Sequence, residues 1–388
     1  MTAERYYLSK GVSVREYENG FFIETYTKEF KVNQAIATFL GLLDGLKTPE
    51  ELADELHPLI QDADRTVIVP LVATFLKDMH RLKVVRREGE PDAVPLTPLY
   101  EPGARVGPYV ITGLLSLHNY FVQVYHATDH ESGQQVVLKM FSHAPACIDS
   151  DASLERAWQQ FQQEFDVMRC LPPHPCICAL QAYYNQPFPF AVLEYLRGDA
   201  LSDCVRNKQL SDGLKEQLAT QVLGALAYVH AHNVVHGDIH ARNFMVTEDH
   251  VTMIDFGFSY RVGGSAATKT VNGGVPTYLP PERIRQHQYA FCQQPANYRA
   301  EVYQIALVLF VLYHQYLPFV GQTWRERAAS ITTFDFSQHL SPAVPHEQVM
   351  LHALQKDPAA RYADGREMLA AWQQALAVES AAPIELTH

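Results

Sequence analysis

Residues His236–Phe244 read HGDIHARNF and are the most informative part of the sequence for the architecture. An apolar strand follows after a short interval and leads into the tripeptide Asp255-Phe256-Gly257. Within the first stretch, Asp238 and Asn243 have the spacing of an H-x-D-x-x-x-x-N loop. Both patterns in this order and at this separation are very improbable as a coincidence. We therefore expect Asp238, Asn243 and Asp255 to form a catalytic centre.

These motifs resemble the catalytic loop and the D-F-G tripeptide of the protein-kinase superfamily, and further stretches agree with that likeness. Val192–Leu196 resembles the hinge, whose backbone bonds the adenine edge. Gly274–Glu282 (GVPTYLPPE) resembles the end of an activation segment, and Arg361 matches the late arginine that pairs with its glutamate. Ala300–Ala306 matches the central buried helix, although Glu301 stands where the family usually has aspartate.

The resemblance also assigns chemical roles, because phosphoryl transfer needs charge neutralisation and alignment more than covalent help. It implies that Lys139 holds the α- and β-phosphates of ATP and that Glu164 pairs with Lys139. It implies that Asn243 and Asp255 bind Mg²⁺, which prefers hard oxygen ligands, and that Asp238 accepts or orients the hydroxyl proton of the substrate. The other residues assigned to the nucleotide site are Val124, Val137, Glu194, Leu196 and Met245.

The loop that covers the phosphates departs from the family pattern. Its glycines should fall at Leu117, Asn119 and Val122, and none of these residues is glycine. Glycine at such positions lets backbone N–H groups approach the phosphates closely. We therefore expect a weaker or differently shaped phosphate cover.

Two positions in the catalytic loop also depart from the pattern. Gly237 replaces the arginine that in many kinases pairs with a phosphorylated activation loop, so switching by that route is not expected. His240 stands where Ser/Thr kinases usually have lysine, and the H-G-D-x-H form is common in kinases of small molecules. Those enzymes generally lack the V-P-T-Y-L-P-P-E segment and the late arginine, which favours a peptide substrate here.

The length of the chain, 388 residues, exceeds that of one ordinary domain. Proline and glycine concentrate in residues 89–108, which indicates a linker. We predict an α+β protein with a winged-helix-like domain over residues 1–88. A bilobal protein-kinase-like fold would follow over 109–377, with an N-lobe over 109–193 and a C-lobe over 197–377.

The first segment combines strand-like and helical patterns. Phe21–Thr27 and Phe30–Val32 are rich in aromatic and β-branched residues, which favours strands. Asn33 can cap a first helix, and Thr48–Glu51 has the pattern of a capping box that begins a second. A third helix would carry apolar residues at helical spacing from Leu71 to Leu82. Strands and three helices in a segment of this length make a winged-helix-like plan.

This segment resembles the PqqD-like precursor-recognition domains of ribosomal peptide natural-product pathways. The likeness is carried by the strand pair, the run Ala35–Leu56 and the closing run Phe75–Val85. In that family a leader peptide adds as an extra strand at an exposed sheet edge beside the third helix. The alternative is an ordinary winged-helix domain with a covered edge, such as a DNA binder, but no concentrated basic helix is present. The residues that the resemblance assigns to the peptide are Lys28, Phe30, Val32 and Phe75.

Composition limits the other possibilities. A formal net charge of -12 argues against nucleic acid as a partner, because proteins that bind it normally carry a basic balance. The longest apolar run, Ile305–Tyr313, is shorter than the roughly 20 residues that a membrane span needs. The N-terminus has no apolar signal core, and the cysteines do not form a C-x-x-C pair. We expect a soluble cytoplasmic protein without nucleic-acid or membrane partners.

These features together suggest a function. A leader-binding domain tied to a kinase raises the local concentration of the substrate at the active site. We predict an ATP- and Mg²⁺-dependent kinase that phosphorylates Ser or Thr of a ribosomally made precursor peptide. If the phosphate serves as a leaving group, a partner lyase or cyclase is needed. The alternatives are a small-molecule or regulatory kinase and a non-catalytic scaffold that binds peptide and nucleotide.

Overall fold

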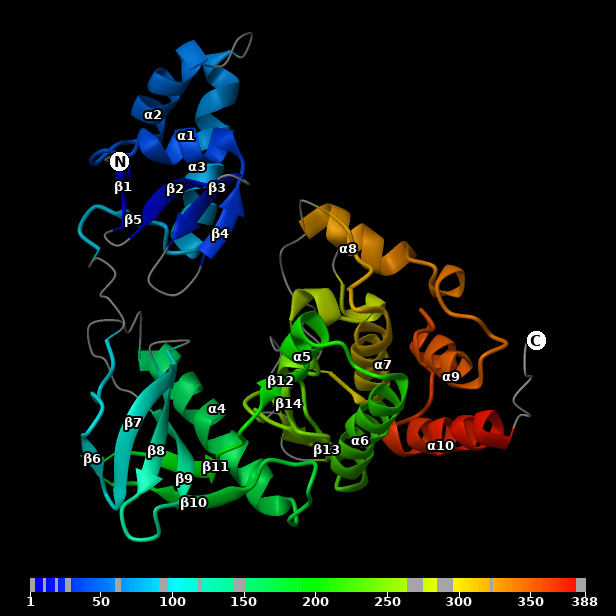
Figure 1. Cartoon of the computed structure of the whole chain (residues 1–388). Helices are drawn as coiled ribbons and strands as arrows, with labels where there is room; N and C mark the ends of the chain where they lie inside the picture. The colour runs from blue at the N-terminus through cyan, green and yellow to red at the C-terminus, as the bar shows by residue number, and fades with distance from the viewer. Residues whose placement is uncertain are drawn as a thin grey trace. The chain divides into compact units, whose positions relative to one another are not determined.

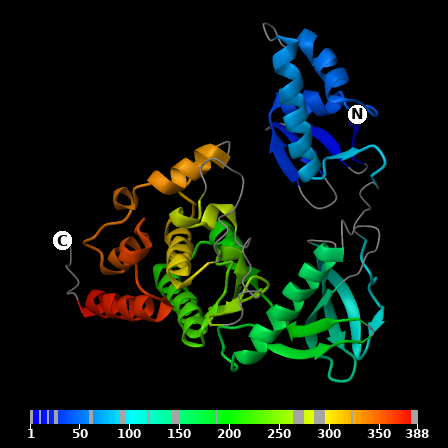
Figure 2. The same cartoon turned by 180° about the vertical axis from the view of Figure 1, so that it is seen from behind.

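The structure is a computed structural model (Figures 1 and 2). Its residues divide into two compact units. One unit comprises Met1–Gln134 and Lys139–Leu154, and the other comprises Gln135–Leu138 and Glu155–His388. In the described part of the chain, no helix is long and apolar enough to cross a membrane. The residues that the structure describes are 4–9, 12–17, 20–24, 29–59, 64–90, 97–117, 121–141, 151–186, 188–263, 275–284, 296–321 and 324–381.

The N-terminal part contains two small antiparallel sheets and three helices. Strands β1 (Tyr6–Leu8) and β5 (Val85–Arg87) form one sheet, and the second sheet has the order β2-β3-β4. The predicted pair of strands, β3 and β4, thus gains β2 as a partner, and β1 pairs with β5 in the separate sheet. Neither β1 nor β2 was indicated by the sequence. The bounds of the other elements are β2 Ser13–Tyr17, β3 Gly20–Glu24, β4 Glu29–Val32, α1 Gln34–Gly41, α2 Pro49–Leu56 and α3 Arg65–Arg81.

The helix starts expected from local sequence are confirmed. The Asn33 side chain accepts a hydrogen bond from the Ile36 amide at 2.9 Å at the start of α1. At the start of α2, the Glu51 amide donates to the Thr48 hydroxyl at 3.1 Å, and the Thr48 amide donates to the Glu51 carboxylate at 2.8 Å. Such reciprocal bonds satisfy amides that a helix start otherwise leaves unpaired.

One expectation about α3 is wrong. Leu71 and Leu82 belong to the predicted apolar face, yet they are 64% and 45% exposed. At 100° per residue, the buried residues Ile68, Val72 and Leu76 define a face that is rotated away from Leu71. Phe75 lies between the two faces, half-buried, with its ring centroid 4.6 Å from that of Phe39.

Three antiparallel strands follow in the first unit. They are β6 (Arg105–Val106), β7 (Tyr109–Ser116) and β8 (Val122–Asp129). The predicted linker therefore contributes the strand β6, which pairs with β7. Two buried side chains of β8 also bind this stretch, because the Leu99 amide donates to the Tyr125 hydroxyl at 2.8 Å and to the Gln123 amide oxygen at 2.9 Å. Strand β9 (Gln135–Phe141) is shared by both units.

The second unit contains most of α4 (Asp151–Cys170) and the antiparallel pair β10 (Leu180–Tyr184) and β11 (Phe190–Glu194). The rest of this unit is largely helical. Helix α7 (Tyr298–His314) confirms the predicted central helix, because all its residues from Ala300 to Leu312 are buried. Helices α6 and α10 pack side by side (Figure 1). The bounds of the remaining elements are β12 Asp199–Ala200, α5 Leu201–Asn207, α6 Asp212–Ala231, β13 Val234–Val235, β14 Phe244–Thr247, β15 His250–Met253, β16 Tyr260–Arg261, α8 Trp324–Thr333, α9 Pro345–Ala353 and α10 Gly365–Ala381.

Candidate active site

The hairpin β14–β15 brings the two predicted motifs together. Its register pairs Phe244 with Met253, which are the residues next to Asn243 and Ile254. The Ile254 amide donates to the Asn243 carbonyl oxygen at 2.9 Å, so Asn243 and Asp255 stand at the same end of the hairpin. The Asn243 side chain, in turn, donates to the Asp238 carbonyl oxygen at 2.9 Å. The structure therefore gathers the three residues of the expected catalytic centre.

The Asp238 carboxylate is buried but incompletely satisfied. Its Oδ2 atom lies 3.4 Å from Nε2 of His240. Its Oδ1 atom is buried and has no hydrogen-bond partner among the described residues. An unpaired buried carboxylate oxygen is costly, and such groups call for an explanation. The side chain keeps 12% of its surface exposed, so a substrate hydroxyl can reach this incompletely bonded carboxylate, which fits the proton-accepting role expected of Asp238.

Asp255 occupies a strained backbone position and keeps its side chain exposed. Its φ is +61°, in the left-handed region that non-glycine residues seldom adopt. The next residue, Phe256, is fully buried, and its ring lies 5.0 Å from the His236 ring. The buried ring thus anchors the tripeptide while the Asp255 carboxylate faces outward. Asn243 donates through its amide nitrogen, which leaves its amide oxygen as a second hard ligand, so the pair fits a Mg²⁺ ion that takes its other ligands from phosphates and water.

Glu301 of α7 binds the backbone of the catalytic loop. Its side chain is fully buried, and it accepts hydrogen bonds from the Gly237 amide at 2.6 Å and the His236 amide at 3.2 Å. His230 donates to it through Nε2 at 2.8 Å, since Nδ1 of His230 accepts from the Gly365 amide. The longer glutamate therefore anchors the loop in place of the usual aspartate. No sequence motif indicates His230, because its partners are distant along the chain.

Gly237 has a conformation that suits glycine alone. Its φ is +86°, and a Cβ atom built there would lie 2.3 Å from the Phe258 carbonyl oxygen. Any side chain at this position, arginine included, would have to displace the segment that follows Asp255. The local packing around Gly237 therefore excludes an arginine at this position.

The remaining nucleotide-site predictions fall on regular elements. Glu164 lies on α4 and is 3% exposed, and Lys139 is half-buried within β9, which continues beyond it to Phe141. The pairing of Glu164 with Lys139 stays a prediction. Glu194 ends β11, and its carboxylate accepts a hydrogen bond from the Ala179 amide at 3.2 Å. The other predicted contacts with the nucleotide are half-buried residues on β8, on β9, after β11 and on β14, namely Val124, Val137, Leu196 and Met245.

Part of the glycine-poor loop can be placed. Leu117 directly follows β7 and Val122 begins β8, and both are half-buried. Asn119 lies outside the described residues, so the shape of the phosphate cover stays a prediction.

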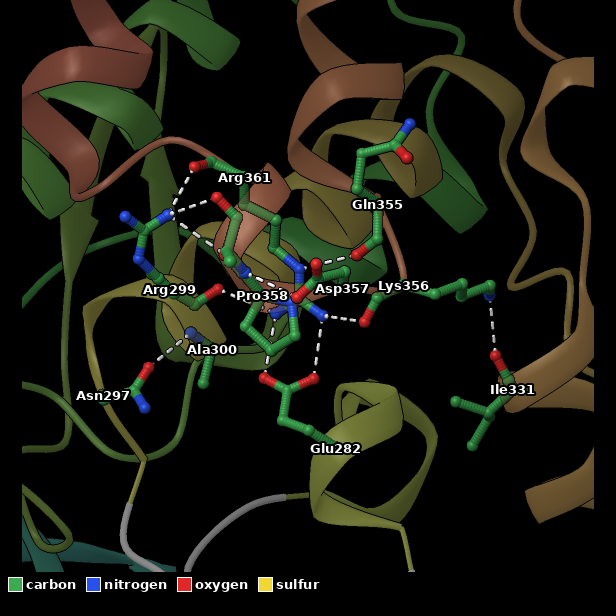
Figure 3. Close-up of polar contacts among 11 residues, drawn as sticks. Glu282, Asn297, Arg299, Ala300, Ile331, Gln355, Lys356, Asp357, Pro358 and Arg361 are labelled. Carbon is green, nitrogen blue, oxygen red and sulfur yellow. Dashed lines mark hydrogen bonds and ion pairs between the residues drawn. The ribbon is translucent and has the colours of Figure 1, made fainter.

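The predicted pair of Arg361 and Glu282 is confirmed. The two terminal nitrogens of Arg361 donate to the two carboxylate oxygens of Glu282 at 2.9 and 2.8 Å (Figure 3). The fully buried guanidinium also donates to the carbonyl oxygens of Gln355, Arg299 and Lys356. Two parallel bonds between guanidinium and carboxylate fix geometry as well as charge. The arginine therefore ties the end of the activation-like segment to the helical unit.

Sequence reasoning missed the side chains that surround this pair. Arg299 donates to the carbonyl oxygens of Pro358 and Arg361, and Lys356 donates to that of Ile331 at 2.8 Å (Figure 3). Burial, together with the nearby Arg361 charge, lowers the pKa of Lys356 to about 8. Both residues donate hydrogen bonds to backbone carbonyls, and such contacts have no sequence motif that would predict them.

Comparison with known proteins identifies the family. Residues 120–375, well over half of the chain, match the model of the protein kinase domain. The chain therefore belongs to the protein kinase family. It is 29% identical to a probable serine/threonine-protein kinase of Streptomyces coelicolor, over 63% of this chain and 37% of that protein.

Two further relatives are eukaryotic. A CBL-interacting protein kinase of rice is 26% identical over 65% of this chain and 56% of its own length. A probable myosin light chain kinase of Dictyostelium discoideum is 26% identical over 66% of this chain and 60% of its own length. The chain thus spans less than two thirds of each of these relatives.

Proposed function

We propose that this protein is an ATP- and Mg²⁺-dependent kinase that phosphorylates Ser or Thr side chains of a ribosomally made precursor peptide. The observation that carries the proposal is the Asp238 carboxylate, which stands beside Asn243 and Asp255 and whose Oδ1 has no hydrogen-bond partner among the described residues. The relatives named as serine/threonine kinases support the choice of a hydroxyl acceptor.

The site's own residues would do the following. Asp238 would accept the proton of the substrate hydroxyl through its carboxylate, while Glu301 keeps the loop backbone in place. Asn243 and Asp255 would hold Mg²⁺, which supplies charge neutralisation at the phosphates. Lys139 would hold the α- and β-phosphates of ATP, with Glu164 as its partner.

A peptide substrate is favoured over a small molecule by the segment that ends at Glu282. Its bidentate bond to the fully buried Arg361 makes the segment an integral part of the fold. Small-molecule kinases that share the H-G-D-x-H form generally lack this pair. His240, the residue that raised that alternative, is buried against Asp238.

The N-terminal domain would hold the leader of the precursor. In the described part of this sheet, β4 (Glu29–Val32) is an edge strand that pairs with β3 alone, so its other side offers backbone groups to an added strand. On α3, the exposed residues Val67 and Leu71 lie one turn apart, and Phe75 follows one turn later. Val32 of β4 and Phe75 of α3 both pack on the domain's core.

An extended peptide with apolar side chains fits this combination of edge and stripe. Val32 and Phe75 face the core, so they would shape the binding surface from below, while Leu71 would touch the peptide directly. Phe30 pairs with Ile23 in the sheet, and Lys28 lies outside the described residues. The peptide contacts of all these residues are proposals, as are the winged-helix class of the domain, the predicted domain boundaries, a cytoplasmic location and a partner lyase or cyclase.

The test uses the full chain with MgATP and a candidate precursor, a Ser- and Thr-containing peptide whose gene is first sought beside that of the kinase, with and without its leader. We expect phosphate on a Ser or Thr of the core peptide only when the leader is present, detected by mass spectrometry. Leu71→Asp should weaken leader binding at least about tenfold, since it places a charge in an apolar contact. Leu59→Asp is the matched control, because Leu59 is as exposed as Leu71, at 60%, in the same domain.

Three results would contradict the proposal. Phosphate transfer to a small molecule would show a different substrate class. Nucleotide binding without any transfer would indicate a scaffold. Equal leader affinity in the Leu71→Asp and Leu59→Asp variants would show that the exposed apolar residues of α3 do not contact the leader.

A further inference from the structure

Helix α4 carries two pairs of glutamines whose members have different surroundings. Gln159 and Gln162 are exposed. Gln160 donates through Nε2 to the Gly257 carbonyl oxygen at 2.8 Å, and Gln163 donates to the Ser259 carbonyl oxygen at 2.6 Å. Residues three and four apart share a face of a helix, so Gln160 lies on the face that also carries Glu164.

The acceptors of these bonds belong to a compact turn that follows Asp255. The Ser259 amide and hydroxyl both donate to the Phe256 carbonyl oxygen, at 2.9 and 2.6 Å, and Ser259 is buried. The turn also packs tightly against the catalytic loop. A Cβ atom at Gly237 would lie only 2.3 Å from the Phe258 carbonyl oxygen, so no side chain fits there. The carbonyls of residues 257 and 259 therefore accept bonds from α4, and the carbonyl of residue 258 between them packs closely against the catalytic loop.

The contact between α4 and this segment continues farther along the helix. Arg261 of β16 lies near the C-terminal end of α4, where its Nη1 is 3.6 Å from the Cys170 sulfur. Asp255 and Glu164, two residues expected at the nucleotide site, thus stand on elements that are joined by side-chain bonds. The two glutamine bonds link a neutral amide to a backbone carbonyl, so they need neither a phosphate nor a charged partner.

We propose that Gln160 and Gln163 are positioning residues that hold α4, and with it Glu164, against the segment that begins at Asp255. The active site is then assembled without a phosphorylated activation loop, in agreement with the glycine at position 237. This inference deepens the proposed function. It rests on one part of that function, the use of MgATP, and does not depend on the peptide substrate.

The experiment compares two double variants of the full chain. Gln160→Glu with Gln163→Glu replaces each donating amide nitrogen by an oxygen that faces a carbonyl oxygen. Gln159→Glu with Gln162→Glu adds the same charge to the exposed face one residue away, and serves as the matched control. Because Gln159 donates to the Glu155 carboxylate at 2.8 Å, this control also loses one side-chain bond, at an exposed site, and is therefore a stringent comparison. The readouts are kcat and KM for ATP, and the dissociation constant of MgATP by calorimetry.

We expect kcat/KM for ATP to fall at least about tenfold in the first double variant, because two partly buried hydrogen bonds are lost. The control should stay within about twofold of the parent, and leader affinity should be the same in all three proteins. A folding defect would lower the yield and the melting temperature, so the kinetic values are compared only between variants whose melting temperature matches that of the parent. If the double variant fails to fold, Gln163→Glu against Gln162→Glu decides, with Gln163→Lys as a variant that retains a donor and should retain activity.

Equal kcat/KM in the two double variants would overturn the proposal. So would a loss of activity when the parent protein is treated with a phosphatase, because the site would then depend on phosphate. The calorimetric comparison does not involve the peptide. A parent that binds MgATP but ignores the precursor would therefore refute the proposed substrate alone, and equal MgATP affinities in the two double variants would then refute the roles of Gln160 and Gln163.

Discussion

Replacing Arg361 by methionine should destabilise the helical unit by about 3 kcal/mol. Methionine keeps the unbranched apolar stem of arginine and removes the guanidinium group. The change therefore isolates the polar contacts drawn in Figure 3 from the packing of the side chain.

The expected loss of stability follows from the hydrogen-bond acceptors that the Arg361 guanidinium satisfies. Its loss leaves the Glu282 carboxylate unpaired and takes a donor from the carbonyl oxygens of Gln355, Arg299 and Lys356. Removing one partner of a buried pair typically costs about 3–5 kcal/mol. The Glu282 side chain is 26% exposed, so water can solvate part of the released carboxylate, which places the expected cost at the lower end of that range.

Urea unfolding followed by circular dichroism measures this cost, and a double-mutant cycle with Glu282→Gln separates the pair from its surroundings. We expect the two changes to be less than additive by about 1–2 kcal/mol, as for residues in direct contact. A cost below about 1 kcal/mol for Arg361→Met, or full additivity with Glu282→Gln, would show that the guanidinium contacts do not stabilise this unit as expected.

Three further predictions concern the catalytic loop and the buried lysine. Asp238→Asn should lower kcat by about 10²–10⁴-fold while MgATP binds with unchanged affinity, and a variant as active as the parent would contradict the assigned role. Gly237→Ala should cost about 1–3 kcal/mol and lower kcat, because its Cβ would meet the Phe258 carbonyl, and an unchanged melting temperature would count against this packing. Burial and the Arg361 charge lower the pKa of Lys356 to about 8, so between pH 8 and its ordinary value of 10.5 the unfolded chain binds more protons than the folded one. Stability relative to Lys356→Met should therefore rise between about pH 8 and 9.5, and a pH-independent difference in unfolding free energy would refute the shift.

The parts of the site that the sequence predicted depend on short-range geometry. Asn243 and Asp255 meet because one tight hairpin joins them, and Thr48 and Glu51 cap α2 because they stand within one turn. The Arg361 pair bridges distant residues, and it was predictable only through the likeness to a family whose pattern contains both.

The unpredicted parts depend on tertiary contacts. Gln160 and its acceptor Gly257 are 97 positions apart, and nothing in the stretch QQFQQ reveals which two of its glutamines face the protein. Strand β1 was missed because its partner β5 lies at the far end of the domain. Leu71 was assigned to the buried face because the periodicity of α3 is apolar on two adjacent faces, and only the packing against the core tells them apart.

The packing at Gly237 limits how this kinase can change in evolution. In the conformation with φ at +86°, the Phe258 carbonyl occupies the space of a side chain, so an arginine that senses phosphate cannot be gained by a single substitution. The turn from Phe256 to Ser259 would have to move first, and α4 would lose both of its glutamine bonds when it did. Control of such an enzyme is thus more readily acquired at the stage of substrate delivery than within the catalytic unit.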